Sequence, residues 1–108
     1  MNKRRVVITG LGTVNAVAND VNTFWENVLV GKSGIAGVTH FELSEEYSSR
    51  IAGEVLGLNP EDYFGKKRLK KLDRYTIFGM YATREALIDA DLMDGGFDPE
   101  RTGCILCT

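Results

Sequence analysis

The sequence predicts an α/β fold that forms one piece of a larger domain, and three observations lead to this prediction. Two short apolar runs, at residues 5–9 and 104–108, are continuous rather than alternating, which is typical of strands buried on both faces of a parallel sheet. Two helical patterns, at residues 21–29 and 74–90, supply apolar faces that would cover such a sheet. Because two strands and two helices leave much apolar surface uncovered, we expect further polypeptide to complete the domain. The alternative is a complete small domain that ends in a strand.

Composition excludes several classes of protein. The 108 residues include 13 Lys and Arg and 15 Asp and Glu, which gives a net charge of −2, with 44% hydrophobic residues. These values exclude a wholly disordered chain, and the slightly acidic total argues against general nucleic-acid binding. No apolar run reaches the roughly 18 residues that cross a bilayer, and the basic start is followed by too few apolar residues for a signal peptide. We therefore expect a cytoplasmic protein that binds neither membrane nor nucleic acid.

The first strand and the first helix are bounded by glycines and short polar residues. Gly10-Leu11-Gly12 follows the strand, but Asn15 stands where a dinucleotide-binding loop needs a third glycine or alanine, so we predict a tight turn and no cofactor. Asn19 or Asp20 is suited to cap the helix, and Gly31 to end it. One face of that helix carries its apolar residues: Val21, Phe24, Trp25, Val28 and Leu29.

The second half of the chain is dominated by one long helix. Residues 32–65 are predicted to be irregular, with a short strand within 51–55 and a turn or the first turn of a short helix at Pro60. From Asp73 to about Ala90 the apolar residues cover most of the helical circumference, which predicts burial between layers. Three small residues on this helix would allow a neighbouring backbone to approach closely: Gly79, Ala82 and Ala86.

A basic cluster precedes this helix. Five of the six residues 66–71 are Lys or Arg, in a chain whose total charge is negative: Lys66, Lys67, Arg68, Lys70 and Lys71. At a helix N-terminus such residues oppose the macrodipole, and a compact positive patch attracts acidic partners. The cluster therefore indicates either a docking surface for an acidic protein or phosphate, or a solvated helix start.

The two cysteines and the one histidine give weak signals. Cys104 and Cys107 are three residues apart on a predicted strand, so their side chains would face opposite ways, and only His40 remains as a further thiol or imidazole ligand. We predict two buried structural cysteines rather than half of a zinc site or a redox pair, and no metal site. His40 is predicted to lie in a loop.

Four segments together resemble the amino-terminal part of the β-ketoacyl-acyl-carrier-protein synthases, and in particular the type II condensing enzymes of bacterial fatty-acid synthesis. Their order and spacing match this family across nearly all 108 residues. The segments are Arg4-Arg5-Val6-Val7-Ile8-Thr9-Gly10-Leu11-Gly12, Gly31-Lys32-Ser33-Gly34-Ile35, Arg50-Ile51-Ala52-Gly53-Glu54-Val55 and Lys71-Leu72-Asp73-Arg74-Tyr75-Thr76.

The resemblance implies a thiolase-like fold, a layered α-β-α-β-α sandwich, of which residues 1–108 are the start of the N-terminal domain. It implies a homodimer that elongates fatty-acid chains by decarboxylative Claisen condensation of malonyl-carrier protein with an acyl-enzyme thioester. It also implies that the family's nucleophilic cysteine, two histidines and supporting lysine lie beyond this chain. Neither Cys104 nor Cys107 matches the nucleophile, so we expect residues 1–108 alone to be inactive, with no catalytic residue among them.

One role of the family maps onto this chain. By position, Lys67, Lys70 and Lys71 match residues that dock the acidic acyl carrier protein, and Arg68 is a plausible addition. Two departures stand against the resemblance: Asn15-Ala16-Val17-Ala18 replaces a Ser/Thr-Pro-x-Gly pattern, and Cys107 replaces a glycine. The alternative to a synthase is therefore a related subunit that binds the carrier protein without catalysing the reaction.

Overall fold

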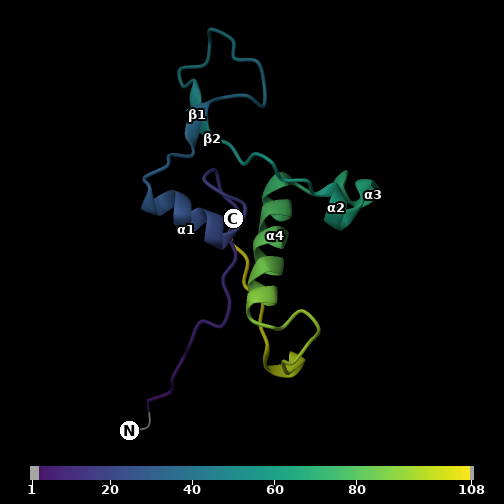
Figure 1. The fold of residues 1–108 in the computed structure, drawn as a ribbon. Coiled ribbons are helices and arrows are strands. Elements are labelled where there is room, and N and C mark those ends of the chain that lie inside the picture. The colour runs from purple at the N-terminus through teal and green to yellow at the C-terminus, as the bar shows by residue number, and fades with distance from the viewer. Residues whose placement is uncertain (1–2, 108) are drawn as a thin grey trace.

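The computed structural model describes residues 3–107, in which short elements surround one long helix (Figure 1). In chain order the elements are α1 (Val21–Leu29), β1 (Ile35–Gly37), β2 (Ile51–Gly53), α2 (Glu61–Phe64), α3 (Lys66–Leu69), α4 (Arg74–Asp89) and a 3₁₀ turn, η1 (Pro99–Arg101). The radius of gyration is 17.6 Å, whereas a compact domain of this length has about 13 Å. The mixed α and β content agrees with the predicted class, but the elements do not close around a common core.

Helix α1 begins and ends as its sequence predicts. The Asp20 carboxylate accepts a hydrogen bond from the Thr23 backbone N–H at 2.8 Å, which satisfies one free donor of the first turn. At the other end Gly31 has φ of 71°, the Gly31 N–H donates to the Val28 carbonyl, and the next N–H donates to the Asn27 carbonyl. This is a Schellman ending, in which glycine takes the left-handed position at no steric cost.

Helix α4 confirms the predicted long helix, but its expected burial is wrong for the described residues. Only Ile77 is buried among them, at 8% exposure. The helix ends in a second Schellman arrangement, in which the Asp91 N–H donates to the Ile88 carbonyl and the Leu92 N–H to the Leu87 carbonyl. Asp91 takes the left-handed position with φ of 58°, where a short polar side chain is tolerated.

A small antiparallel hairpin stands at one end of the molecule. Strand β2 confirms the strand predicted within 51–55, and it pairs with β1 in the register Ala36 opposite Ala52. Strand β1 lies in a region that we predicted to be irregular, because three residues carry too little pattern to show pairing. Next to the hairpin, the Glu54 carboxylate accepts hydrogen bonds from the Thr39 N–H, the Thr39 hydroxyl and the His40 N–H. These hydrogen bonds lower the pKa of Glu54 to about 2, and the bond from the Thr39 hydroxyl has the largest effect.

The N-terminal segment lies against α4 through its glycines. A Cβ on Gly10 would overlap the Ala86 carbonyl oxygen, and a Cβ on Gly12 would overlap the Ala82 carbonyl oxygen. The predicted tight turn at 10–12 is therefore wrong, because these glycines allow an extended backbone to approach a helix. The close approach predicted at Ala82 and Ala86 is confirmed.

Two carboxylates on the same stripe of α4 hold this segment. Glu85 accepts the Thr13 N–H at 2.9 Å through one oxygen and the Val21 N–H at 2.8 Å through the other, and Asp89 accepts the Leu11 N–H at 2.9 Å. Small residues and carboxylates alternate at helical spacing over 82–89, so one face of α4 provides both the room and the hydrogen-bond acceptors. Glu85 thereby joins the first loop, the start of α1 and α4.

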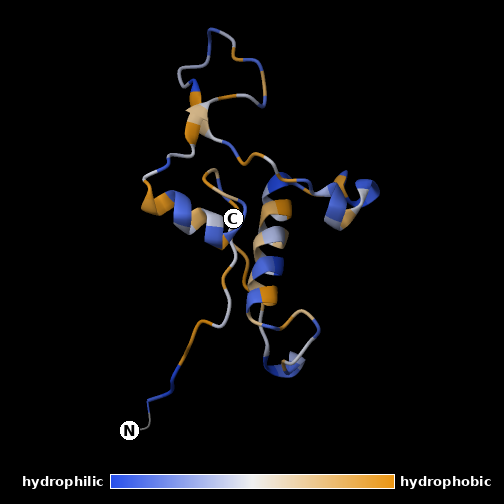
Figure 2. Ribbon diagram, in the orientation of Figure 1, coloured by the Kyte–Doolittle hydropathy of each residue, from blue (hydrophilic) through white to orange (hydrophobic). Residues whose placement is uncertain are grey.

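Neither predicted buried strand forms in the described structure. Val6 is 92% exposed and Ile105 is 89% exposed, and no ladder includes residues 5–9 or 104–107. Figure 2 shows the apolar N-terminal segment extending away from the other elements. A strand needs partner strands on both sides to bury continuous apolar sequence, and the described residues supply none to these two segments. The predicted burial of the two cysteines does not occur within the described residues for the same reason, since Cys104 and Cys107 are both exposed there.

Candidate functional site

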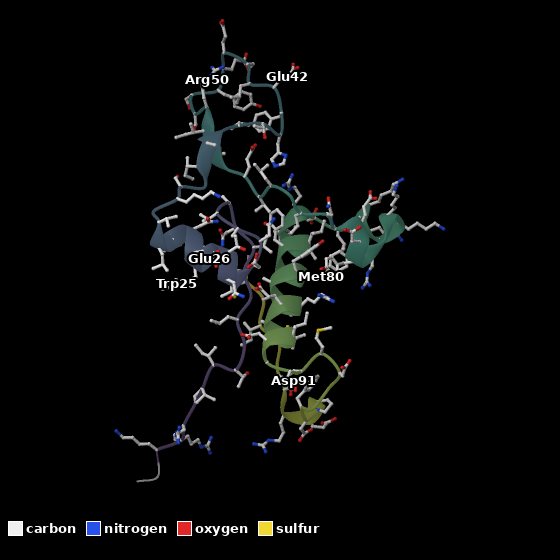
Figure 3. The ribbon with its side chains drawn as sticks, in the orientation of Figure 1. Trp25, Glu26, Glu42, Arg50, Met80 and Asp91 are labelled. Carbon is white, nitrogen blue, oxygen red and sulfur yellow. The ribbon has the colours of Figure 1, made fainter. Side chains whose placement is uncertain are left out.

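The basic cluster forms its own helical turn at the surface. Gly65, with φ of 68°, separates α2 from α3, and α3 is a single turn of four residues that carries Lys66, Lys67 and Arg68. The helical turn that carries the first residues of the cluster is thus separate from α4. The prediction that these basic residues oppose the dipole of the long helix is therefore wrong. In Figure 3, side chains that end in nitrogen extend from the α2–α3 region away from the rest of the molecule.

Four residues of the cluster face solvent with their charges available. Lys66 pairs with Glu61 at 3.5 Å, and this is the one ion pair that the structure shows within residues 3–107. The remaining four residues are exposed and line a single shallow hollow, which we call the basic patch: Lys67, Arg68, Lys70 and Lys71. Because no carboxylate of the described residues neutralises it, the basic patch presents a local positive field on a chain of negative total charge.

An aromatic cluster attaches α2, and with it the basic patch, to α4. The Tyr81 ring meets Tyr63 at 4.7 Å and Phe64 at 5.7 Å between centroids, both edge to face. The Arg84 guanidinium lies over the Tyr63 ring at 4.7 Å from its centroid. The Tyr81 hydroxyl donates to the Asn59 carbonyl at 2.7 Å, just before α2 begins. Sequence analysis missed this attachment, although aromatic residues on either side of a basic run were a usable signal.

The protonation of Tyr81 supports this attachment. Burial raises the pKa of the Tyr81 hydroxyl, and the neighbouring Tyr63 and Asp62 raise it further, while Arg84 opposes them. The hydroxyl therefore remains a donor to Asn59 throughout the physiological pH range. The basic patch is therefore held by aromatic packing, by the Arg84 guanidinium over the Tyr63 ring and by this hydroxyl donor.

His40 lies in a loop, as predicted, and faces an arginine. Its Nε2 is 3.2 Å from an Arg74 guanidinium nitrogen. Since a guanidinium only donates, Nε2 is the acceptor in this hydrogen bond. No thiol lines the hollow that holds His40, and among the described residues no three His, Cys, Asp or Glu side chains gather as metal ligands do. The structure thus brings together Lys67, Arg68, Lys70 and Lys71, but it does not bring His40 to either cysteine.

The basic patch thus presents four positive side chains, and an aromatic cluster attaches it to α4. Residues 3–108 match the family model described as "Beta-ketoacyl synthase, N-terminal domain". The chain belongs to this family. The resemblance drawn from the four sequence segments is confirmed.

Two bacterial relatives illustrate the match. A protein named 3-oxoacyl-[acyl-carrier-protein] synthase 2 from Staphylococcus aureus (strain COL) is 45% identical over 89 residues, covering 82% of this chain and 21% of the relative. A protein of the same name from Vibrio cholerae is 41% identical over 92 residues, covering 85% of this chain and 22% of the relative. The β-ketoacyl synthase chain described here therefore spans about a fifth of the length of these relatives. Within residues 3–107, no helix combines the length and apolarity that a bilayer crossing requires.

Proposed function

We propose that residues 1–108 are the amino-terminal part of the N-terminal domain of a 3-oxoacyl-carrier-protein synthase. The parent reaction is the decarboxylative Claisen condensation of a malonyl thioester on carrier protein with an acyl-enzyme thioester, in fatty-acid elongation. The family match and the names of the relatives support this proposal. The thiolase-like layered fold and a homodimeric assembly are part of it. Exposed apolar segments at 5–9 and 104–107 support the layered fold, because a sheet built on them would cover α4.

The role proposed for this part of the protein is docking of an acidic acyl carrier protein by the basic patch. The observation that carries it is the exposure of four unpaired positive side chains on one hollow: Lys67, Arg68, Lys70 and Lys71. Complementary charge speeds the encounter of two proteins and selects the orientation in which they meet. Because α2 is attached to α4 by Tyr81, docking would occur at a fixed place on the domain.

We propose that the chemical step uses residues outside 1–108. His40 is held as an acceptor toward Arg74, so its imidazole nitrogen is not directed at a thiol. Cys104 and Cys107 lie on an exposed segment, and Arg84 is the one cationic side chain among the residues that line their groove. We therefore expect residues 1–108 alone to bind carrier protein and to form no 3-oxoacyl product.

Charge reversal tests the docking role. Lys67→Glu, Lys70→Glu and Lys71→Glu together should abolish saturable binding of acidic carrier protein, measured by calorimetry or surface plasmon resonance at low salt. The matched control reverses three exposed basic residues elsewhere, Arg4, Lys32 and Arg101, and changes net charge equally. It should bind nearly as well as the unaltered protein, and binding by the latter should weaken steeply with added salt. Binding that persists in the first variant, or fails equally in the control, would show that the patch does not dock the carrier.

A second candidate function is a subunit that binds carrier protein without catalysis. It rests on the loop that departs from the family pattern, which forms a well-bonded turn. The Asn15 side chain accepts the Val17 N–H at 2.8 Å and the Ala18 N–H at 3.2 Å, so the missing proline and glycine are replaced by an Asx turn. A condensation assay on the native gene product decides between the two: carrier binding without 3-oxoacyl product would favour the subunit.

A further inference from the structure

Gly65 divides what would otherwise be one helix into two single turns. Helix α2 ends and α3 begins at this residue, whose φ of 68° and ψ of 148° are accessible mainly to glycine. Its N–H donates to the Glu61 carbonyl, and its own carbonyl accepts the Leu69 N–H. Within the described residues, neither the Lys66 nor the Lys67 N–H donates to the carbonyl four residues earlier. The helical hydrogen-bond pattern is therefore interrupted at Gly65.

The interruption matters because of the spacing between the basic patch and the aromatic attachment. Tyr63 and Phe64 of α2 pack on Tyr81 of α4, and we call the side of α2 that carries them the anchored face. In a continuous helix, residues three, four or seven positions later lie on the same face. Lys67 and Arg68 follow Tyr63 and Phe64 by four positions, and Lys70 and Lys71 follow them by seven. An unbroken helix would therefore turn the whole basic patch toward α4.

We infer that Gly65 is a positioning residue for docking of the acidic acyl carrier protein, because its positive-φ backbone directs the basic patch away from the anchored face. This inference rests on the docking role proposed above. In the structure all four residues of the basic patch are exposed, whereas Phe64 is half-buried. Lys66 and Glu61 form an ion pair at 3.5 Å although they are five positions apart, a spacing at which a continuous helix separates side chains.

Orientation and charge can be separated at this position. Gly65→Ala removes no charge, and an added Cβ would meet no atom within 4 Å, so the substitution introduces no clash. It changes only the backbone preference, because alanine disfavours positive φ and is the strongest helix former. We therefore expect α2 and α3 to join in this variant and the basic patch to lose its exposure.

Binding and hydrogen exchange of the Gly65→Ala variant of the native gene product test the inference. Calorimetry with acidic carrier protein at low salt should show binding weakened by about tenfold, with a shallower dependence on salt, although net charge is unchanged. Amide exchange at Lys66 and Lys67 should be fast in the unaltered protein, where these N–H groups lack a helical partner, and slow in Gly65→Ala. Circular dichroism should show helix content retained or increased.

Two further variants separate positioning from general damage. Gly31→Ala is the matched control, since Gly31 has φ of 71° and equally open surroundings, and it should bind carrier protein like the unaltered protein. Gly65→Asn should retain more binding than Gly65→Ala, because asparagine tolerates positive φ and is a poorer helix former. Should Gly65→Ala not fold, Gly65→Asn against Gly31→Ala still gives the comparison, with partial loss expected only at position 65.

The outcomes distinguish this inference from the docking role itself. Unaltered binding in Gly65→Ala, unchanged exchange at the two amides, or equal loss in Gly31→Ala would overturn the positioning role of Gly65. If the Lys67, Lys70 and Lys71 charge reversal abolishes binding while Gly65→Ala binds normally, the docking role stands and only the positioning role fails. If that charge reversal leaves binding intact, the docking role fails, and the positioning role fails with it.

Discussion

The two flanks of α4 hold extended chain in opposite ways. On one flank Gly10 and Gly12 touch the helix backbone, and Glu85 and Asp89 accept three backbone N–H groups from the adjoining chain. On the other flank the segment 103–107 borders a groove of about 390 Å³ and, within the described residues, donates no hydrogen bond to α4. Both flanks carry apolar sequence, so apolarity alone does not decide attachment. Attachment to α4 is decided by specific hydrogen-bond acceptors on the helix and by the absence of a Cβ at the two glycines.

The largest expected effect comes from filling the close approach on the first flank. Gly12→Ala places a methyl group against the Ala82 carbonyl oxygen, which is backbone and cannot move aside, so we expect a loss of about 3 kcal/mol in the free energy of unfolding. Gly79→Ala is the matched control on the groove flank. There a Cβ meets nothing within 4 Å, and alanine favours the helix, so stability should rise by about 1 kcal/mol. Urea denaturation of both variants measures this contrast. If Gly12→Ala were as stable as Gly79→Ala, the two flanks of α4 would not differ in how closely the chain approaches the helix.

The next effect concerns the acceptor that joins three segments. Glu85→Gln leaves one oxygen and replaces the other with an NH₂ group that cannot accept, so either the Thr13 or the Val21 N–H loses its partner. We expect destabilisation of about 2 kcal/mol, the range for a hydrogen bond to a charged group.

Glu100→Gln serves as the control for this carboxylate, since Glu100 is exposed in η1 and the change should leave stability within about 0.5 kcal/mol. Amide hydrogen exchange should also accelerate at Thr13 and Val21 in Glu85→Gln alone. A variant with unchanged exchange at both amides would contradict the role given to Glu85.

A smaller effect is expected from the groove flank itself. Leu106→Ala removes an exposed side chain that contacts no closed core, so stability should change by less than about 0.5 kcal/mol. Ile77→Ala, at the buried position of α4, should instead cost about 3 kcal/mol. Thermal unfolding of the pair compares them directly. A large loss in Leu106→Ala would show that the groove closes in solution.

The smallest effect on stability is expected outside α4, at the hairpin. Because the folded pKa of Glu54 is about 2 and its usual value is 4.5, the ionised carboxylate favours the folded loop above pH 4.5. This contribution is lost as pH falls from 4.5 toward 2. NMR titration should find a Glu54 pKa of about 2, and Thr39→Val should raise it by removing the hydroxyl that is the main cause. A pKa near 4.5 in the unaltered protein would contradict the bonding described.

Local signals in the sequence predicted α1, α4 and strand β2 correctly. The Asp20 cap, the Gly31 stop and the span of α4 depend on residues within a few positions of one another, so they can be predicted from local sequence. Long-range partners were harder to predict. The bonds of Glu85 join residues 72 and 64 positions apart, and nothing in the local pattern marks them. The basic patch was identified by residue type, but its attachment through Tyr63 and Tyr81 was not.

The sequence by itself determined the ends of α1, the span of α4, the four positive side chains and the membership of the family, because each follows from short-range chemistry or from ordered segments. Only the tertiary structure decided that Gly10 and Gly12 serve contact with a helix, that the two cysteines are exposed beside two methionines, and that α3 stands apart from α4. The physical reason is that strand pairing, burial and close approach depend on a partner, and the identity of that partner is absent from local sequence.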